Sequence, residues 1–231
     1  MLTRKIISTD DGSSTIFIPE WNESYHSKHG AVQEAYHVFI RNGLELLSNK
    51  KEISILEIGF GTGLNALITL LESHNSKQII HYTALEKYPV AEGEHRLLNY
   101  PSAILDFYPT LPFVENEIQN QYSKLINSDW KEFQTLSSTF NLRKIQSDFL
   151  DFNYPKETFD LIYFDAFGAR VQPELWTKEL FQKIYDSMKT DSVFTTYSSK
   201  GSVRRALMKV GFNVEKHPGP PGKREMLIAK K

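Results

Sequence analysis

The chain has 231 residues, and its 27 lysines and arginines nearly balance its 28 aspartates and glutamates, so the net charge is close to zero. It contains no cysteine, which excludes disulfides, thiolate metal sites and cysteine nucleophiles. No apolar run approaches the roughly 18 residues of a membrane span, and MLTRKIISTDDGSS lacks the apolar core of a secretory signal, so we expect a soluble cytoplasmic protein.

The first 50 residues are predicted to form an extension ahead of the main domain. Two short β-like runs flank Asp10, Asp11 and Gly12, whose turn chemistry favours a hairpin. Residues 25–47 then place apolar side chains at helical spacing, which predicts a helix. We therefore expect a β hairpin and helix over residues 1–50, followed by one domain over 51–231.

That domain is predicted to be an α/β fold with a Rossmann-like sheet of about seven strands, the last one antiparallel. Five strand candidates alternate with helical segments, which predicts parallel strands with crossover helices: ISILEIGF, IIHYTALEK, RKIQSDF, FDLIYFDAF and SVFTTYSS. The last two runs, FNVEKHPG and REMLIAKK, leave little room for a helix and are expected to form an antiparallel hairpin. The aromatic-rich segment 92–141 exceeds a simple crossover and is expected to be a helical insertion near the site.

A glycine-rich turn follows the first of these strands. In EIGFGTGLN, Gly59, Gly61 and Gly63 open a helix, where missing side chains let the backbone turn tightly and approach a ligand. Their G-x-G-x-G spacing differs from the dinucleotide pattern G-x-G-x-x-G, in which a pyrophosphate lies at the helix N-terminus. S-adenosylmethionine has no phosphate and carries a sulfonium, so it tolerates nearby acids, and Glu57 stands just before the turn.

Acidic residues follow the next two strand candidates. Glu86 ends the second strand, where an acid can accept hydrogen bonds from both ribose hydroxyls, although NAD-binding proteins share this feature. Asp148 follows the third and can accept the adenine amino proton, with Phe149 beside the ring. Together with the glycines, these residues resemble the class I methyltransferase pattern; either acid alone is equally well explained as a capping or surface residue.

The fourth strand is almost wholly apolar and leads to Asp165, at the edge where open α/β sheets bind ligands. Asp160, near the start of that strand, is expected to be a surface acid. An acid at the position of Asp165 suits an amine substrate, so we expect a nitrogen nucleophile with Asp165 as the catalytic residue. A carboxylate of ordinary pKa is a weak base for an alkylammonium, so orientation of the amine is its expected role, and the reaction needs no metal.

Seven segments, in order and across nearly the whole chain, resemble the methyltransferase of the tRNA 5-methylaminomethyl-2-thiouridine biosynthesis family, the methyltransferase half of the bifunctional MnmC protein. The segments are DGSSTIF, YHSKHGAVQEAYHVFI, EIGFGTGLN, EKYP, FDAFGARVQPELW, VRRALMKVGF and PGKREML. The resemblance implies S-adenosylmethionine as cofactor and methylation of the aminomethyl nitrogen of 5-aminomethyl-2-thiouridine at the tRNA wobble position. Since the chain ends at Lys231, without room for a flavin-dependent oxidase half, it looks like the stand-alone, MnmD-like form. The family commonly reads D-[AG]-F-A-P where this chain has DAFGAR, so the loop after Asp165 is expected to differ.

The resemblance also bears on how tRNA is bound. Tyr25 and His26 fall in the family-like N-terminal motif and are expected to line the site, although a structural hydrogen bond accounts for His26 equally well. The wobble base lies in the anticodon loop, where a splayed uridine can enter a pocket. The C-terminal part, with nine lysines and arginines against two glutamates from residue 200 onward, can attract phosphates, although ordinary solvated faces explain it as well. The expected phosphate contacts are Lys200, Arg204, Arg205, Lys223 and Arg224.

Three alternatives remain open from the sequence. A methyltransferase for a small amine would share every cofactor residue but would not show the salt dependence of RNA binding. A nicotinamide dehydrogenase would need the glycine spacing that is absent here. A non-catalytic RNA-binding module would bind tRNA without transferring a methyl group.

Overall fold

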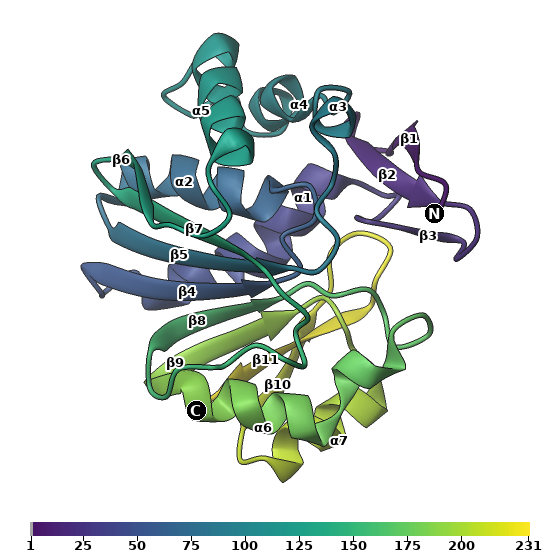
Figure 1. The fold of residues 1–231 in the computed structure, drawn as a ribbon, viewed down its shortest axis with the longest axis vertical. Coiled ribbons are helices and arrows are strands. Elements are labelled where there is room, and N and C mark those ends of the chain that lie inside the picture. The colour runs from purple at the N-terminus through teal and green to yellow at the C-terminus, as the bar shows by residue number, and fades with distance from the viewer. Residues whose placement is uncertain (1) are drawn as a thin grey trace.

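A computed structural model describes residues 2–231 of the chain. Within this range the main sheet has eight strands in the order β10-β11-β9-β8-β4-β5-β7-β6, and β1, β2 and β3 form a separate small sheet (Figure 1). No helix in this part of the chain has the length and apolar character needed to cross a bilayer.

The centre of the main sheet is parallel, as predicted. It consists of β4 (Glu52–Ile58), β5 (Ile79–Glu86), β7 (Phe140–Gln146), β8 (Phe159–Phe164) and β9 (Met188–Thr196). Every residue of β8 is buried, which is typical of a parallel strand covered on both faces. Burial includes Asp160, so the expectation that it is a surface acid was wrong.

The C-terminal hairpin is also confirmed. Strand β10 (Asn213–Pro218) pairs antiparallel with β11 (Glu225–Lys230), and β11 pairs antiparallel with β9, so the reversed strand lies inside the sheet and not at its edge. At the opposite edge, β6 (Gln134–Ser137) pairs antiparallel with β7. This eighth strand replaces the last part of the expected helical insertion.

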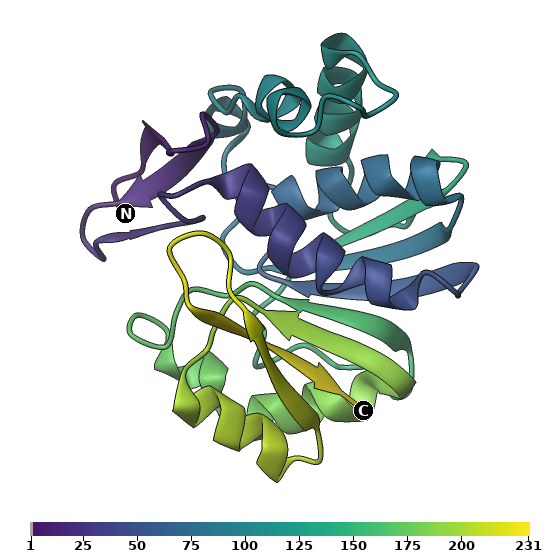
Figure 2. The same cartoon turned by 180° about the vertical axis from the view of Figure 1, so that it is seen from behind.

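Helices cover both faces of the sheet (Figures 1 and 2). On one face lie α1, η1, η2 and α2, whose apolar side chains share a core with Ile53 and Ile55 of β4. On the other lie η3, α6 and α7, packed with Leu56 and Ile58 of the same strand. The bounds of these elements are α1 (Ala31–Ala35), η1 (Tyr36–Arg41), η2 (Leu44–Leu47), α2 (Leu64–Ser76), η3 (Pro173–Trp176), α6 (Lys178–Ser187) and α7 (Gly201–Lys209).

The insertion forms a helical layer over α2 (Figure 1). It contains α3 (Glu92–His95), α4 (Tyr100–Phe107) and α5 (Glu115–Asn127). Its aromatic side chains pack against the main domain: the Trp130 and Phe60 ring centroids are 5.7 Å apart, and those of Phe113 and His74 are 5.5 Å apart. The buried Lys144 Nζ donates to the carbonyls of Leu125 and Ile126 at the end of α5, which fixes this helix to the sheet.

The N-terminal segment forms the predicted hairpin of β1 (Lys5–Ser8) and β2 (Ser14–Ile18), and β3 (Glu23–Ser24) adds a third strand. Helix α1 then continues into η1, a π-helical turn with one extra residue per turn. The carbonyl of Val38 in this turn accepts a hydrogen bond from Thr195 Oγ1 of β9 at 2.9 Å. The division of the chain after residue 50 stays a prediction, while residues 31–47 share one core with the sheet.

Candidate active site

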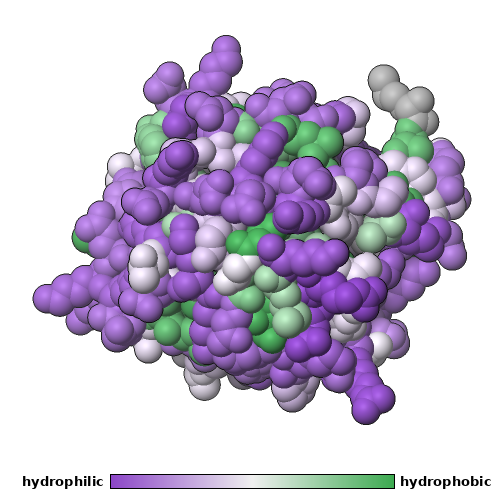
Figure 3. Space-filling view, turned by 90° about the horizontal axis from the view of Figure 1, so that it is seen from below, coloured by the Kyte–Doolittle hydropathy of each residue, from purple (hydrophilic) through white to green (hydrophobic). Residues whose placement is uncertain are grey.

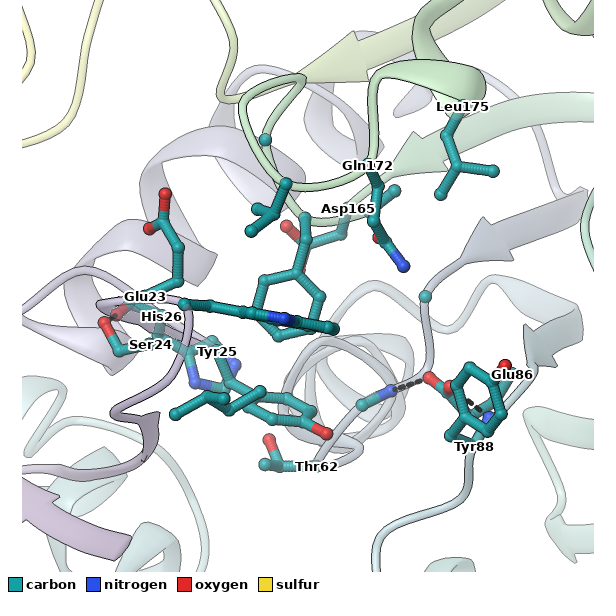
Figure 4. Close-up of a pocket in the computed structure, with 18 of the residues that line it drawn as sticks. Glu23, Ser24, Tyr25, His26, Thr62, Glu86, Tyr88, Asp165, Gln172 and Leu175 are labelled. Carbon is teal, nitrogen blue, oxygen red and sulfur yellow. Dashed lines mark hydrogen bonds between the residues drawn. The ribbon is translucent and has the colours of Figure 1, made fainter. Parts of the chain in front are cut away.

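A cavity of about 1340 Å³ opens at the carboxyl edge of the parallel strands. The turns after β4, β5, β7, β8 and β9 line one side of it, and the N-terminal segment lines the other. Figure 4 shows Asp165 approaching the cavity from the loop after β8, with Tyr25 and His26 approaching from the N-terminal segment. The fold therefore gathers residues from both ends of the chain around one pocket.

The three glycines of the β4–α2 turn have positive φ angles of 95°, 51° and 76°, and they serve different contacts. A Cβ on Gly59 would lie 2.6 Å from the carbonyl oxygen of Asp165, so this glycine lets two strand ends pass closely. A Cβ on Gly61 would meet the Tyr25 ring at 3.1 Å, and both residues line the pocket. A Cβ on Gly63 would instead meet apolar side chains of α5 at 3.0 Å, so Gly63 is required for packing beneath the site.

Glu86 lies directly beside this turn. Its Oε2 accepts a hydrogen bond from Gly61 N at 3.0 Å, and its Oε1 accepts one from Tyr88 N at 2.8 Å (Figure 4). Burial raises the pKa of Glu86, and these backbone donors act in the opposite direction. Each carboxylate oxygen has a second lone pair, so Glu86 can still accept hydrogen bonds from the hydroxyls of a ribose.

Asp148 and Phe149 border the pocket at the end of β7. Lys87 Nζ donates to Asp148 Oδ2 at 2.6 Å, and this bond lowers the pKa of Asp148. Its Oδ1 accepts from Leu150 N at 2.9 Å, which fixes the carboxylate at the start of the loop. The buried Phe149 ring supplies an apolar wall beside it.

Asn65, in the first turn of α2, links two acids that the sequence analysis treated separately. Its Nδ2 donates to Glu57 Oε1 at 3.0 Å and to Asp165 Oδ2 at 2.8 Å. Glu57 is completely buried behind the pocket, burial raises its pKa well above the usual range, and its Oε2 has no partner within residues 2–231. Asn65 was not predicted from the sequence, although its place two positions after the last glycine of GFGTGLN was a usable signal.

Asp165 lies at the carboxyl edge with a strongly perturbed pKa. Burial raises this pKa to about 7, and the nearby charge of Glu34 acts in the same direction. The hydrogen bond from Asn65 and the charge of Lys223 offset part of the shift. Asp165 is therefore a better proton acceptor than the ordinary carboxylate assumed from the sequence.

Tyr25 and His26 both line the pocket. The Tyr25 ring packs edge-to-face against Phe167, with 5.0 Å between the centroids, and burial raises the pKa of Tyr25 to about 12. His26 Nδ1 and Thr15 Oγ1 are hydrogen-bonded at 3.1 Å, and burial lowers the pKa of His26 to about 4. His26 is therefore neutral near pH 7, and it also makes the structural hydrogen bond considered from the sequence.

The expected phosphate contacts separate into two groups. Lys200 and Lys223 line the pocket, whereas Arg204, Arg205 and Arg224 lie outside it. Lys223 Nζ donates to Glu34 Oε1, which places this lysine inside the site.

Arg170 of the DAFGAR segment closes the pocket on its outer side. Its Nη2 donates to the Trp21 carbonyl at 2.6 Å and to Glu23 Oε1 at 2.8 Å, which ties the loop after β8 to the N-terminal sheet.

The donor and acceptor set fits S-adenosylmethionine. The cradle at Gly61 admits close approach of a ligand, and the Glu86 carboxylate faces the cavity beside it. The Asp165 carboxylate lines the pocket with only partial compensation of its charge, which favours a cationic sulfonium nearby. This combination of an open glycine turn and acids at successive strand ends agrees with the ligand expected from the sequence.

Comparisons with known proteins cover the whole chain. Residues 114–231 match the family model of S-adenosyl-L-methionine-dependent methyltransferases. The chain is 33% identical over 234 residues to the tRNA 5-methylaminomethyl-2-thiouridine biosynthesis bifunctional protein MnmC of Burkholderia mallei, a match that covers 96% of this chain and 34% of that protein. The homologous protein of Burkholderia thailandensis is 32% identical over 233 residues, with the same coverage. The chain thus spans about a third of the length of these curated relatives.

Solved structures show the same relationship. The crystal structure of MnmC2 from Aquifex aeolicus matches 100% of this chain and 71% of its own, with a TM-score of 0.77 and 25% identity. A spermidine synthase in complex with the transition-state analogue AdoDATO matches 99% of this chain and 73% of its own, with a TM-score of 0.53. At 14% identity, this second match shows a common fold alone.

Proposed function

Since the chain belongs to the family of S-adenosyl-L-methionine-dependent methyltransferases, we propose that it methylates the aminomethyl nitrogen of 5-aminomethyl-2-thiouridine at the wobble position of tRNA. The product would be 5-methylaminomethyl-2-thiouridine, the nucleoside in the name of the MnmC relatives. The observation that carries the proposal is Asp165, a carboxylate with a pKa of about 7 beside the glycine turn. Such a group is suited to an amine substrate that must lose a proton before it can react.

S-adenosyl-L-methionine is the cofactor of this family, and when bound it supplies an electrophilic methyl group. In our proposal the backbone at Gly59 and Gly61 lies against the cofactor, Glu86 accepts its ribose hydroxyls, and Asp148 with Phe149 holds its adenine. Glu57 and Gly63 act from behind: Glu57 anchors Asn65, and Gly63 allows α5 to pack against the turn.

Asp165 is proposed to orient the substrate amine and to accept its proton. An alkylammonium is mostly protonated near neutral pH, so proton removal is part of the work. Because the pKa of Asp165 is raised to about 7, it lies closer to the pKa of the amine. Proton transfer from the ammonium to Asp165 is therefore easier than transfer to an ordinary aspartate. The aromatic side chains Tyr25, Phe167 and Tyr197 also line this pocket and are proposed to restrict access of water to Asp165.

The tRNA is proposed to lie across the mouth of the pocket. A tRNA substrate would place the enzyme in the cytoplasm. Lys200 stands at the pocket just before α7, while Arg205 and Arg224 are exposed and available to phosphates. The face over α6 and α7 is mostly hydrophilic (Figure 3). Changing Arg204 and Arg205 to alanine should flatten the salt dependence of tRNA binding while leaving cofactor affinity unchanged.

The test uses two anticodon stem-loops that differ only at the wobble position, which carries either 5-aminomethyl-2-thiouridine or 2-thiouridine. Incubation with methyl-labelled S-adenosylmethionine should label only the first, and nucleoside analysis should identify 5-methylaminomethyl-2-thiouridine. Labelling of small amines without labelling of either stem-loop would refute the tRNA substrate. Cofactor binding with no transfer to any amine would leave an RNA-binding module as the better account.

A further inference from the structure

Four side chains from distant parts of the chain meet at the pocket near the loop after β8. Glu34 comes from α1, Asp165 from the end of β8, Tyr197 from the end of β9, and Lys223 from the loop between β10 and β11. This loop reaches the start of α1, as the view from behind shows (Figure 2). The charges of Glu34 and Lys223 act on the pKa of Asp165, and the charges of Asp165 and Glu34 act on the pKa of Tyr197, so the four groups form one electrostatic unit.

Within this unit the ammonium of Lys223 is held by a carboxylate and an aromatic ring. Lys223 Nζ donates to Glu34 Oε1 and lies 4.0 Å from the centroid of the Tyr197 ring. The second oxygen, Glu34 Oε2, accepts a hydrogen bond from Ser27 N at 2.7 Å, which fixes the carboxylate in place. A carboxylate beside an aromatic face is an arrangement that binds alkylammonium groups in general.

We infer that Glu34, Asp165 and Tyr197 form the binding site for the substrate ammonium, and that Lys223 and the substrate compete for it. The inference rests on the proposed function, since the aminomethyl group of that substrate is a primary alkylammonium, the same chemical group as the end of a lysine. Glu34 is thereby assigned as a specificity-determining residue, and Lys223 as an exchangeable occupant of the site.

The burial of the two partners supports this exchange. The Glu34 side chain is only 9% exposed, so its carboxylate needs a cation wherever the lysine moves. The Lys223 side chain is 32% exposed and belongs to a surface loop, so its ammonium can turn outward to water or to a phosphate. Loss of Lys223 from the site would leave Glu34 and Asp165 as two neighbouring carboxylates, which strongly favours entry of another cation.

Competition for one site gives selectivity for the aminated nucleoside. A wobble uridine without the aminomethyl group brings no cation and cannot replace Lys223 on Glu34. The ammonium of an aminated uridine would take the place of the Lys223 ammonium beside Glu34. The Glu34 carboxylate would then compensate the buried charge of the substrate.

The test compares the affinity of the protein for the aminomethyl stem-loop with its affinity for the 2-thiouridine stem-loop; the ratio is the amine preference. Glu34→Gln keeps the size of the side chain but removes its charge, and should lower the amine preference by about tenfold or more. Lys223→Met removes the competing cation and should raise affinity for the aminated stem-loop relative to the other. The matched control is Lys28→Met, because Lys28 also lines the pocket and its Nζ lies 4.7 Å over the Phe17 ring.

The outcomes separate this inference from the proposed function. Calorimetric titration with S-adenosylmethionine checks that each variant is folded. If the wild-type protein methylates the aminated stem-loop but Glu34→Gln keeps the full amine preference, the inference is overturned and the function stands. If Lys223→Met weakens both stem-loops equally, Lys223 is an ordinary phosphate contact and the exchange is refuted. Absence of methyl transfer by the wild-type protein, with an amine preference that depends on Glu34, refutes the function and supports the ammonium site.

Discussion

Two aspartates at opposite ends of strand β8 show how differently the two edges of the sheet are built. Asp160, at the amino edge, is 3% exposed and accepts hydrogen bonds from Lys50 Nζ at 2.7 Å, Lys189 Nζ at 2.8 Å and Ser54 N at 2.9 Å. Burial acts to raise its pKa, but these three donors lower it overall. Asp165, at the carboxyl edge, has one side-chain donor in Asn65, and burial raises its pKa to about 7.

The contrast in charge compensation assigns a stabilising role to Asp160 and a proposed functional role to Asp165, at the two ends of one strand. At the amino edge each charge is compensated by the protein itself, so ionisation of Asp160 stabilises the folded state. At the carboxyl edge the charge of Asp165 is incompletely compensated, so a ligand can supply the missing cation or proton. The four predictions below test this contrast, beginning with the largest expected effect.

Asp165→Asn should lower the rate of methylation by about 100-fold to 10,000-fold, the range typical of a lost proton-accepting group. The wild-type rate should rise as the pH passes about 7, because Asp165 must be ionised to accept the proton. The rate of the variant should not show this rise near pH 7. It should recover partly at higher pH, where more free amine is present. Single-turnover methylation of the aminomethyl stem-loop across pH provides the measurement; near-normal rates throughout would remove Asp165 from catalysis.

Glu86→Ala should weaken S-adenosylmethionine binding by about 1.5 to 3 kcal/mol, as expected when hydrogen bonds to a charged group are lost. It also leaves Gly61 N and Tyr88 N without their present acceptor. Calorimetry gives the dissociation constant, and Glu92→Ala, an exposed glutamate of α3, is a suitable control. An unchanged constant for Glu86→Ala would place the ribose elsewhere.

Asp160→Asn should lower the free energy of unfolding by about 1 to 3 kcal/mol, because an amide cannot compensate two lysines and satisfy Ser54 N equally well. The pKa of Asp160 is lowered in the folded state, so its stabilising contribution is present above the unfolded pKa and is lost as the pH falls through the folded pKa. The difference between wild type and variant should therefore shrink in acid. Denaturant titrations at several pH values measure this, and cofactor affinity at pH 7 should remain unchanged.

The smallest expected effect is a gain in the free energy of unfolding, opposite in sign to the loss expected for Asp160→Asn. Asp165 has a raised pKa, so ionising it destabilises the folded protein progressively between the model-peptide value of 3.8 and about 7. Asp165→Asn should therefore be more stable than wild type at pH 8, by an amount of the order of 1 kcal/mol or roughly 2–4 °C. The gain should disappear near pH 4, and thermal melts at the two pH values provide the comparison. A variant less stable than wild type at pH 8 would show that the carboxylate is already well compensated.

The elements that were predictable from the sequence are those with strong local patterns. The wholly buried run FDLIYF of β8 and the glycine turn after β4 identified the sheet and its ligand edge. Strand β6 was missed because QTLS is short and polar, and it is a strand only through its pairing with β7. Asp160 was misjudged because its lysine partners come from separate segments of the chain.

Within the site, the residues at strand ends were predictable, and the side chains joined by long-range contacts were not. Glu86, Asp148 and Asp165 follow apolar strands, which marks them as residues of the carboxyl edge. Glu34 and Lys223 are 189 positions apart, and nothing in either local segment indicates that they meet. For the same reason the sequence analysis assigned an ordinary pKa to Asp165, since burial and the charge of Glu34 arise only in the folded chain.

The π-helical turn η1 (Tyr36–Arg41) has a consequence for the comparison of homologous sequences. A homologue with one residue fewer in this stretch would form a regular α-helix in place of the π-helical turn. In a sequence alignment, the gap would therefore not suggest a change of structure. Removing that residue rotates everything on the amino-terminal side by about 100° relative to the sheet. Glu34 lies two positions before the turn, and its carboxylate would then point away from Lys223 and Asp165. Under our inference that Glu34 binds the substrate ammonium, a single-residue gap here should therefore mark homologues with a different substrate.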